Sequence, residues 1–281
     1  VDTLNKANYE YYVLNNPSME DKEYDSLYRK LQKLEKESGT ILSKSPSVNV
    51  GYPVVSKLKK VKHDIPLKSL DNIFNEEGIE QFCKLSSTVG RTIVLSTKLD
   101  GLTTKLEYNN EGYLVRASTR GNGEVGEDIT HNIHTYTNIP YKINHKGGLV
   151  VVGESYILNE DFEEINKKRE EQGLQLFKNP RNLASGSVRS LDSKVCSTRK
   201  LRFSAFSVLE GIEVTNRFAS YIFLSNLKIP VVKHMVINNT CTPEYIIECI
   251  QSLRIDSEKN GVPNDGVVLA YNDIEFSKSL G

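Results

Sequence analysis

The sequence has no tryptophan, two methionines and four cysteines among its 281 residues. The cysteines form no CxxC pair and have no histidine at ligand spacing; they are Cys83, Cys196, Cys241 and Cys249. This pattern argues against a zinc site within the chain and against a disulfide framework, and it favours a cytoplasmic location. No apolar run approaches the roughly 20 residues of a membrane span, and no signal-peptide pattern opens the chain. We therefore expect no membrane partner.

An excess of charge of either sign is also missing. The 36 Lys and Arg residues balance the 36 Asp and Glu residues, so no global basic field indicates nucleic-acid binding, and any polyanion site must be local. With 38% hydrophobic and 26% charged residues, the chain has a globular composition and is long enough for one large domain or two unequal ones. It begins with Val1 and stops at Gly281 without a closing element, as we expect of a fragment.

The first 70 residues divide into a helical part and a linker. Apolar residues at three-to-four spacing predict helices over 4–15 and 19–37, and Pro17 predicts a break after which Ser18 caps the second helix. Residues 39–70 contain several prolines and a basic run, which is typical of a linker. We expect a helical subdomain over 1–65 and a second domain over 66–281.

Downstream, the pattern changes to short strands. They are expected over 92–97, 103–108, 113–118, 149–153, 201–209, 231–237 and 266–271. Two helices interrupt them, one over 159–171 with Asn159 as its cap and one over 243–255. Strands in meanders with few helices indicate an α+β fold with antiparallel sheets rather than a doubly wound parallel sheet.

The most informative short segment is Lys98-Leu99-Asp100-Gly101. A lysine at the end of a predicted strand, followed by an Asp-Gly turn, places an amine at a sheet end, where it can act as a nucleophile. The tetrapeptide is short and common, and an exposed lysine in a hairpin turn explains it on its own. Its meaning therefore depends on the motifs that follow it.

Four further segments follow in order. Arg120 opens a glycine-rich loop able to approach a phosphate, and Glu154 follows an apolar run with a carboxylate suited to ribose hydroxyls. Arg181 and Arg189 flank a stretch of small residues, and Asp265 precedes another apolar run. Each segment alone has an ordinary explanation, such as a turn glycine or a surface carboxylate. Together, and in this order, they are hard to ascribe to chance.

This ordered set resembles the NAD-dependent DNA ligases of bacteria over nearly the whole chain. The resemblance implies an antiparallel-sheet nucleotidyltransferase domain, of the ATP-grasp-like DNA ligase type, behind a small helical subdomain that binds nicotinamide mononucleotide. It implies that Lys98 and Asp100 are catalytic and that Arg181 and Arg189 contact phosphate or DNA. The positions that match NAD-contacting residues of the family are Tyr11, Asp21, Tyr24, Asp25, Ser69, Leu70, Ser96, Arg120, Glu154 and Asp265.

The same resemblance implies a reaction and its partners. Lys98 would attack the α-phosphorus of NAD, expel nicotinamide mononucleotide and carry AMP for transfer to the 5′-phosphate of nicked double-stranded DNA. Mg²⁺ or Mn²⁺ would assist as a cofactor. Zinc is expected only in the family's further C-terminal parts, and we expect the chain to be a monomer.

A basic segment over 174–202 is the best candidate for contact with the DNA backbone. It holds seven cations against one acid, Asp192, in a chain of zero net charge. A basic run over 57–62 is a weaker candidate, because a basic linker is often merely solvated.

Four positions depart from the family pattern. Ser96 stands where a glutamate is usual, which removes an acceptor for the adenine amino group, and Ala270 stands where a lysine would face the α-phosphate. Tyr12 replaces a histidine, and Asn122 replaces an aspartate of the glycine-rich loop. Two alternatives stay open: a nucleotidyltransferase that uses ATP or GTP, and a weakened pseudo-ligase that binds NAD or nicked DNA without turnover.

Overall fold

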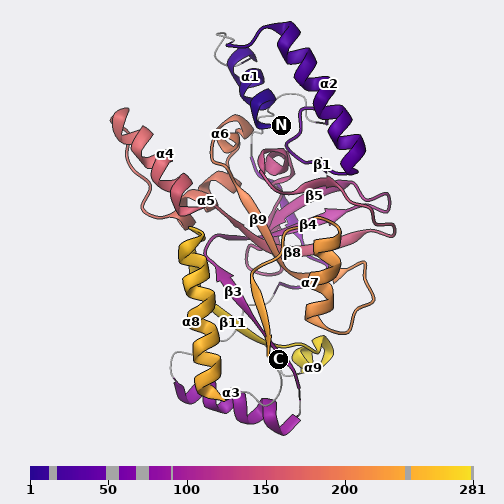
Figure 1. The fold of residues 1–281 in the computed structure, drawn as a ribbon, viewed down its shortest axis with the longest axis vertical. Coiled ribbons are helices and arrows are strands. Elements are labelled where there is room, and N and C mark those ends of the chain that lie inside the picture. Colours follow the sequence, from indigo (N-terminus) through magenta and orange to yellow (C-terminus); the bar gives the residue numbers. More distant parts are fainter. Residues whose placement is uncertain (13–17, 49–56, 68–75, 90, 238–241, 280–281) are drawn as a thin grey trace.

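The computed structural model describes residues 1–12, 18–48, 57–67, 76–89, 91–237 and 242–279. The molecule is elongated: helices α1 and α2 lie at one end, two sheets follow, and helix α3 lies at the other end (Figure 1). The described helices are α1 (Asp2–Tyr12), α2 (Asp21–Ser38), α3 (Glu76–Val89), the 3-10 helix η1 (Thr130–Thr135), α4 (Asn159–Glu171), α5 (Pro180–Val188), α6 (Ser193–Ser197), α7 (Arg217–Asn226), α8 (Pro243–Lys259) and α9 (Ile274–Ser279).

A four-stranded antiparallel sheet forms the middle of the molecule, in the order β5-β4-β8-β9. Its strands are β4 (Leu102–Tyr108), β5 (Leu114–Thr119), β8 (Leu149–Tyr156) and β9 (Arg202–Glu210). Leu106 and Val151 face each other across β4 and β8 and are completely buried in the largest core cluster. Because side chains alternate along a strand, Thr103 and Glu154, which also face each other, lie on the opposite face of the sheet.

A three-stranded antiparallel sheet in the order β10-β3-β11 packs against α3 and α8. Its strands are β3 (Ile93–Leu99), β10 (His234–Ile237) and β11 (Asn264–Tyr271). Leu95 faces the two helices, whereas Val94 packs with Tyr221 of α7 on the other face. By alternation, Ser96 and Lys98 share the face of Val94. Both main sheets are antiparallel, which confirms the α+β prediction.

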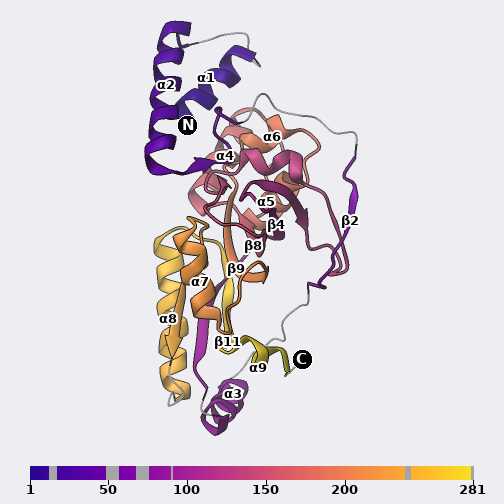
Figure 2. The same ribbon diagram turned by 90° about the vertical axis from the view of Figure 1, so that its right-hand side faces the viewer.

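The described part of segment 39–70 is not a free linker, which corrects the sequence-based expectation. It contains β1 (Ile41–Leu42), which pairs with β7 (Pro140–Lys142), and β2 (Lys60–Lys62), which pairs with β6 (Val125–Glu127). Figure 2 shows β2 along the side of the molecule, away from α8. Pairing satisfies backbone groups that an isolated segment would leave to water. The domain boundary between residues 65 and 66 stays a prediction.

The helix starts also differ in detail from the predictions. Ser18 does not cap α2: its hydroxyl and backbone N–H both bind the Glu10 carboxylate, and Glu20 occupies the cap position without a side-chain bond. Asn159 is the first residue of α4, and Leu158 takes the cap position. In both cases the predicted capping residue was one or two positions from the true start, within the usual uncertainty of helix ends.

Candidate active site

Lys98 lies near the end of β3, and its Nζ contacts the carboxylate of Asp265 on β11. The antiparallel register, in which Lys98 faces Gly266, brings the two residues together although 167 positions separate them in the chain. Both side chains are partly exposed, so a substrate in solvent can reach the amine. Two of the site residues predicted from sequence are therefore in direct contact.

The turn Asp100-Gly101 joins β3 to β4 at the same sheet end. A Cβ at position 101 would collide with the carbonyl oxygen of Ser155 on β8, so only glycine fits there. Asp100 Oδ1 accepts a hydrogen bond from Arg181 Nη1 at 3.2 Å. Arg181 lies in the first turn of α5, where Asn179 is the N-cap. The start of this helix thus places Arg181 against the turn that follows Lys98.

Glu154 lies on β8 directly opposite Thr103, whose Oγ1 donates a hydrogen bond to Glu154 Oε2 at 3.0 Å. Burial raises the pKa of Glu154 to about 7, although the hydroxyl of Thr103 and the positive charges of Arg120 and Arg181 pull this pKa downward. A carboxyl whose pKa is displaced to neutrality by burial, with specific charge partners in a cleft, is typical of a functional site.

Arg120 opens the loop that follows β5, and the side chains of His63 and Asn122 hold this loop through its backbone. His63 Nε2 lies 3.1 Å from the carbonyl oxygens of both Thr119 and Arg120, and it can bond them as an N–H donor. Asn122 Oδ1 accepts hydrogen bonds from the backbone N–H groups of Glu124 and Val125, at 3.0 and 2.8 Å. Asparagine therefore supports this turn at the position where the family usually has aspartate.

These elements enclose a cavity of about 560 Å³. Four of the predicted site residues line it: Arg120, Glu154, Arg181 and Arg189. Lys98 and Asp100 do not line it, but Gly101 does, and Arg181 of the lining bonds Asp100, two residues after Lys98. Lys60, Thr103 and Glu127 also line the cavity and were not among the predicted site residues. Their signal in the sequence was weak, since Lys60 belongs to a basic run and Glu127 to the glycine-rich segment.

The described side chains of the helical motif do not lie at this cavity. No described side chain of α1 or α2 lines it, and Tyr24 stacks on Tyr28 of its own helix with ring centroids 6.1 Å apart, while Asp25 is exposed. The side chains of Tyr11 and Asp21 lie outside the described part of the structure. The predicted positions Ser69 and Leu70 lie in the range 68–75, which is also outside it.

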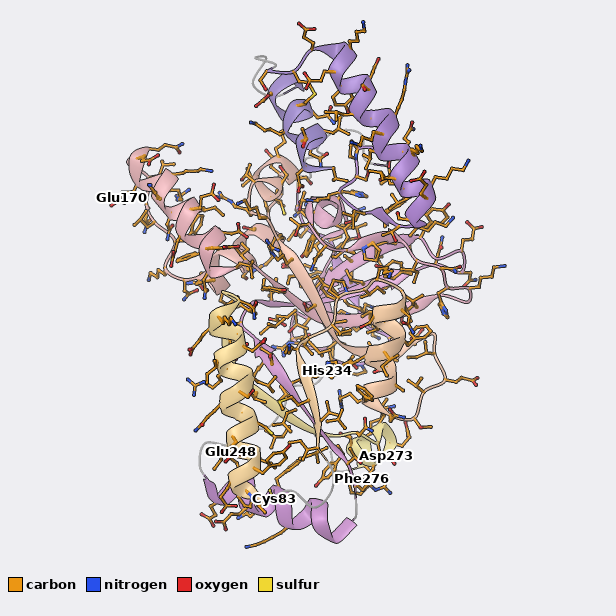
Figure 3. All side chains as sticks on the ribbon, viewed as in Figure 1. Cys83, Glu170, His234, Glu248, Asp273 and Phe276 are labelled. Carbon is orange, nitrogen blue, oxygen red and sulfur yellow. The ribbon has the colours of Figure 1, made fainter. Side chains whose placement is uncertain are left out.

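Ser96 and Ala270, two positions at which the chain departs from the family pattern, are near neighbours in the sheet. Ser96 is only 5% exposed and lies opposite His234 of β10. The ring of His234, labelled in Figure 3, has its centroid 4.7 Å from that of Tyr221. Ala270 faces Val94, so it is diagonal to Ser96 across the β3–β11 pair. Four residues of strand, about 13 Å, separate its register from that of Lys98. Ala270 nevertheless lies on the same face of the sheet as Lys98, and the expectation that a cation at 270 would face the α-phosphate stays a prediction.

Four of the seven cations of the basic segment 174–202 pair with acids from other parts of the chain, and its contact with DNA stays a prediction. Arg189 binds Glu127, whereas Lys200 and Arg202 both bind Asp161 of α4. Acids distant in sequence supply these partners, so the count of one acid within the segment overstated its free charge. Helix α4, with Glu170 near its tip, projects from the body of the molecule (Figure 3). Of the cations in this segment, Arg181 and Arg189 are among the residues that line the cavity.

A metal site made by protein side chains does not fit the described residues. Among them, no three His, Cys, Asp or Glu side chains lie close enough together to hold an ion. The three described cysteines, Cys83, Cys196 and Cys249, are buried. We therefore derive no step through a metal.

Two family models match the chain. The NAD-dependent DNA ligase adenylation domain matches residues 55–281, and the DNA ligase-like N-terminal NAD⁺-binding domain matches residues 1–51. The DNA ligase of Ruminiclostridium cellulolyticum is 40% identical over 100% of this chain and 42% of its own length, and that of Thermodesulfovibrio yellowstonii is 37% identical over 100% and 43%. A solved archaeal ATP-dependent RNA ligase, 13% identical, aligns over 88% of this chain and 59% of its own with a TM-score of 0.42.

The strand-rich part is therefore a nucleotidyltransferase-type ligase domain, an enzymatic domain with the fold that the sequence predicted. The chain belongs to the NAD-dependent DNA ligase family, which confirms the resemblance found in the sequence. It spans about two fifths of the length of the curated relatives it matches. No helix in the described ranges is long and apolar enough to cross a membrane.

Proposed function

We propose that this chain takes AMP from NAD onto Lys98. Lys98 Nζ, as a neutral amine, attacks the α-phosphorus of NAD and forms a P–N bond. The P–O bond to nicotinamide mononucleotide breaks, and the mononucleotide leaves with the electron pair. Asp265, in contact with Nζ, is placed to accept the proton that the amine loses. The observation that carries the proposal is this amine, in contact with Asp265, on the strand whose following turn bonds Arg181 and opens onto a cavity lined by three arginines and Glu154.

The cavity residues have complementary tasks. Arg120 and Arg181 would offset the charge that develops on the phosphate oxygens, and such fixed donors act most strongly where water is excluded. Asp100 orients Arg181 through their hydrogen bond. Glu154 would accept hydrogen bonds from ribose hydroxyls, and Ser69 and Leu70 would lie near the adenosine. Mg²⁺ or Mn²⁺ would bind mainly through the phosphates of the substrate, since Mg²⁺ commonly uses one or two carboxylates with phosphates and waters.

The nicotinamide end would be bound by the helical part. Asp21 and Asp25 are one turn apart on α2, so they share a face with each other and lie beside Tyr24. This face offers carboxylate acceptors for ribose and an aromatic platform for the nicotinamide ring. No described side chain of α1 or α2 lines the cavity, so we propose that the helical part approaches it when both parts bind one NAD molecule.

The AMP would then pass to the 5′-phosphate of a DNA nick, in DNA replication and repair, once the longer protein supplies its remaining parts. The match to an NAD-binding domain at residues 1–51 supports NAD over ATP or GTP as the donor. The relatives favour neither a nucleotidyltransferase that uses ATP or GTP nor a weakened pseudo-ligase. The test is a comparison of NAD, ATP and GTP as donors of labelled nucleotide to the purified chain. Labelling by ATP or GTP in place of NAD would overturn the proposal.

A further inference from the structure

Arg217, the first residue of α7, is a half-buried cation that no acid neutralises within the described part of the chain. No carboxylate there forms an ion pair with its guanidinium, and its buried Nε has no hydrogen-bond partner. A guanidinium has five N–H donors and no acceptor, and a buried donor without a partner is costly. Arg217 therefore keeps donors that a ligand can use.

This arginine lies beside the two neighbouring positions at which the chain departs from the family pattern. Its backbone N–H donates a hydrogen bond to the carbonyl of Asn272, two residues after Ala270, at 2.7 Å. One turn later on α7, Tyr221 packs against the face of β3 that carries Ser96. Burial raises the pKa of the Tyr221 hydroxyl, whereas Arg217 and Ser96 lower this pKa, so both side chains reach the hydroxyl.

This part of the sheet face has the composition of a site for a nucleotide base. Ligand sites are mostly apolar, with a few polar groups that fix orientation. Apolar side chains pack together here; they are Val94, Phe206, Tyr221 and Val232. Ser96 lies about 7 Å along β3 from Lys98 and on the same face. A nucleotide whose phosphorus is at Lys98 can therefore extend its base along this face, while its phosphates meet the cavity lined by arginines.

The polar groups at this end recognise a purine differently from a glutamate. A carboxylate only accepts hydrogen bonds, so it matches the amino group of adenine and repels a carbonyl oxygen in its place. The Ser96 hydroxyl donates and accepts, so it fits either group. Arg217 only donates, and an arginine fork matches the carbonyl oxygen and N7 of a 6-oxopurine. These side chains thus lack the feature that would reject a 6-oxopurine.

We propose that Arg217 is a specificity-determining residue that binds the purine base, and that the chain accepts nicotinamide hypoxanthine dinucleotide about as well as NAD. The bonds that form and break are those of the NAD reaction: the P–N bond to Lys98 forms, nicotinamide mononucleotide leaves with the electron pair of the P–O bond, and the proton of the amine passes to Asp265. Lys98 then carries inosine monophosphate in place of AMP. The inference rests on the proposed function, since it takes Lys98 as the nucleophile.

The test compares the two dinucleotides on one preparation of each variant. The second-order rate constants for labelling Lys98 give one ratio, and the dissociation constants give a second ratio that needs no turnover. The wild-type chain should favour NAD by less than about tenfold, whereas a site built to hydrogen-bond one group rejects the analogue that lacks it by roughly 10⁴-fold or more. Because each ratio compares two substrates on the same sample, an unfolded fraction cancels.

Three variants separate the roles of the side chains. Arg217→Met should lower the use of the hypoxanthine dinucleotide about five- to fifty-fold more than that of NAD, since it removes one base-reading arginine. Ser96→Glu should raise the preference for NAD about tenfold or more, because a carboxylate would face the carbonyl oxygen. Arg254→Met is the matched control: this exposed arginine lies on α8, which packs on the opposite face of β3, and both ratios should stay unchanged.

Three results would overturn the inference. They are rejection of the hypoxanthine dinucleotide by the wild-type chain by more than about tenfold; equal losses of both dinucleotides in Arg217→Met, which would assign this arginine to the phosphates or to the fold; and an equal change of ratio in Arg254→Met. Failure of the proposed function alone has a different signature: both dinucleotides bind with the expected ratio, yet neither labels Lys98. Binding of neither dinucleotide would overturn both.

Discussion

Replacing Glu154 by glutamine should stabilise the protein in a pH-dependent way. Its carboxyl has a pKa of about 7 in the folded state against a usual value of 4.5, because burial disfavours the charged form. The folded protein therefore holds this proton more tightly than the unfolded chain does. Between about pH 4.5 and pH 7 the unfolded chain binds fewer protons, so stability falls as the pH rises through this window. Above it, the full cost of ionising Glu154 is present.

The size of the effect follows from the pKa difference. At about 1.36 kcal/mol per pKa unit, an ionised Glu154 costs the folded state about 3 kcal/mol at pH 8 and less than about 1 kcal/mol at pH 5. Glu154→Gln removes this cost while keeping an oxygen that can accept the hydrogen bond from Thr103. The gain in unfolding free energy should thus be about 2–3 kcal/mol larger at pH 8 than at pH 5.

Urea unfolding of the two proteins at pH 5, 6, 7 and 8 measures this difference directly. Glu111→Gln in the exposed β4–β5 turn is the control, and it should show no such trend. The variant should also react more slowly with NAD, since it loses one of the two carboxylate oxygens proposed to accept hydrogen bonds from ribose. A gain that is the same at pH 5 and pH 8 would refute the assignment of a neutral-range pKa to Glu154.

Three further predictions follow from the same structure. Asp25→Asn should slow the reaction with NAD without shifting the urea midpoint, because the side chain is exposed. The neighbouring Glu23→Gln should change neither the rate nor the midpoint, and an equal loss of rate in both variants would argue against α2 as part of the nicotinamide site. Ser96→Glu and Ala270→Lys should tighten NAD non-additively, with a coupling of about 0.2–1 kcal/mol in a double-mutant cycle, since they are diagonal neighbours; strict additivity would count against the register. Gly101→Ala should lower the unfolding free energy by about 1–3 kcal/mol in urea because its Cβ has no room, and an unchanged midpoint would contradict the close approach.

The strands around the lysine were predictable because their pattern is local. Apolar runs of the right length and an Asp-Gly turn fixed β3 and β4 to within two residues of their observed bounds. Helix α5 was missed although its start signal, Asn179 as cap followed by Pro180, is also local. The start of α5 was therefore predictable from the sequence alone.

The pairing of distant charges was beyond sequence reasoning. The family resemblance indicated Lys98, Arg181 and Arg189 individually. Their partners, which are Asp265, Asp100 and Glu127 respectively, depend on strand register and helix placement. A single sequence does not determine how segments 62 to 167 residues apart are placed against one another. For the same reason the basic segment looked freer of acids than it is, and Lys60 was left out of the site.

The measurement that tests the central claim most directly is the intact mass of the chain after incubation with NAD and Mg²⁺, followed by peptide mapping. We expect the mass to increase by one AMP group, located on the peptide that contains Lys98, and we expect no increase for Lys98→Ala. Lys62→Ala, an exposed lysine outside the proposed catalytic site, should take up AMP like the wild type. No gain in mass, AMP on another residue, or AMP uptake by Lys98→Ala would contradict the account.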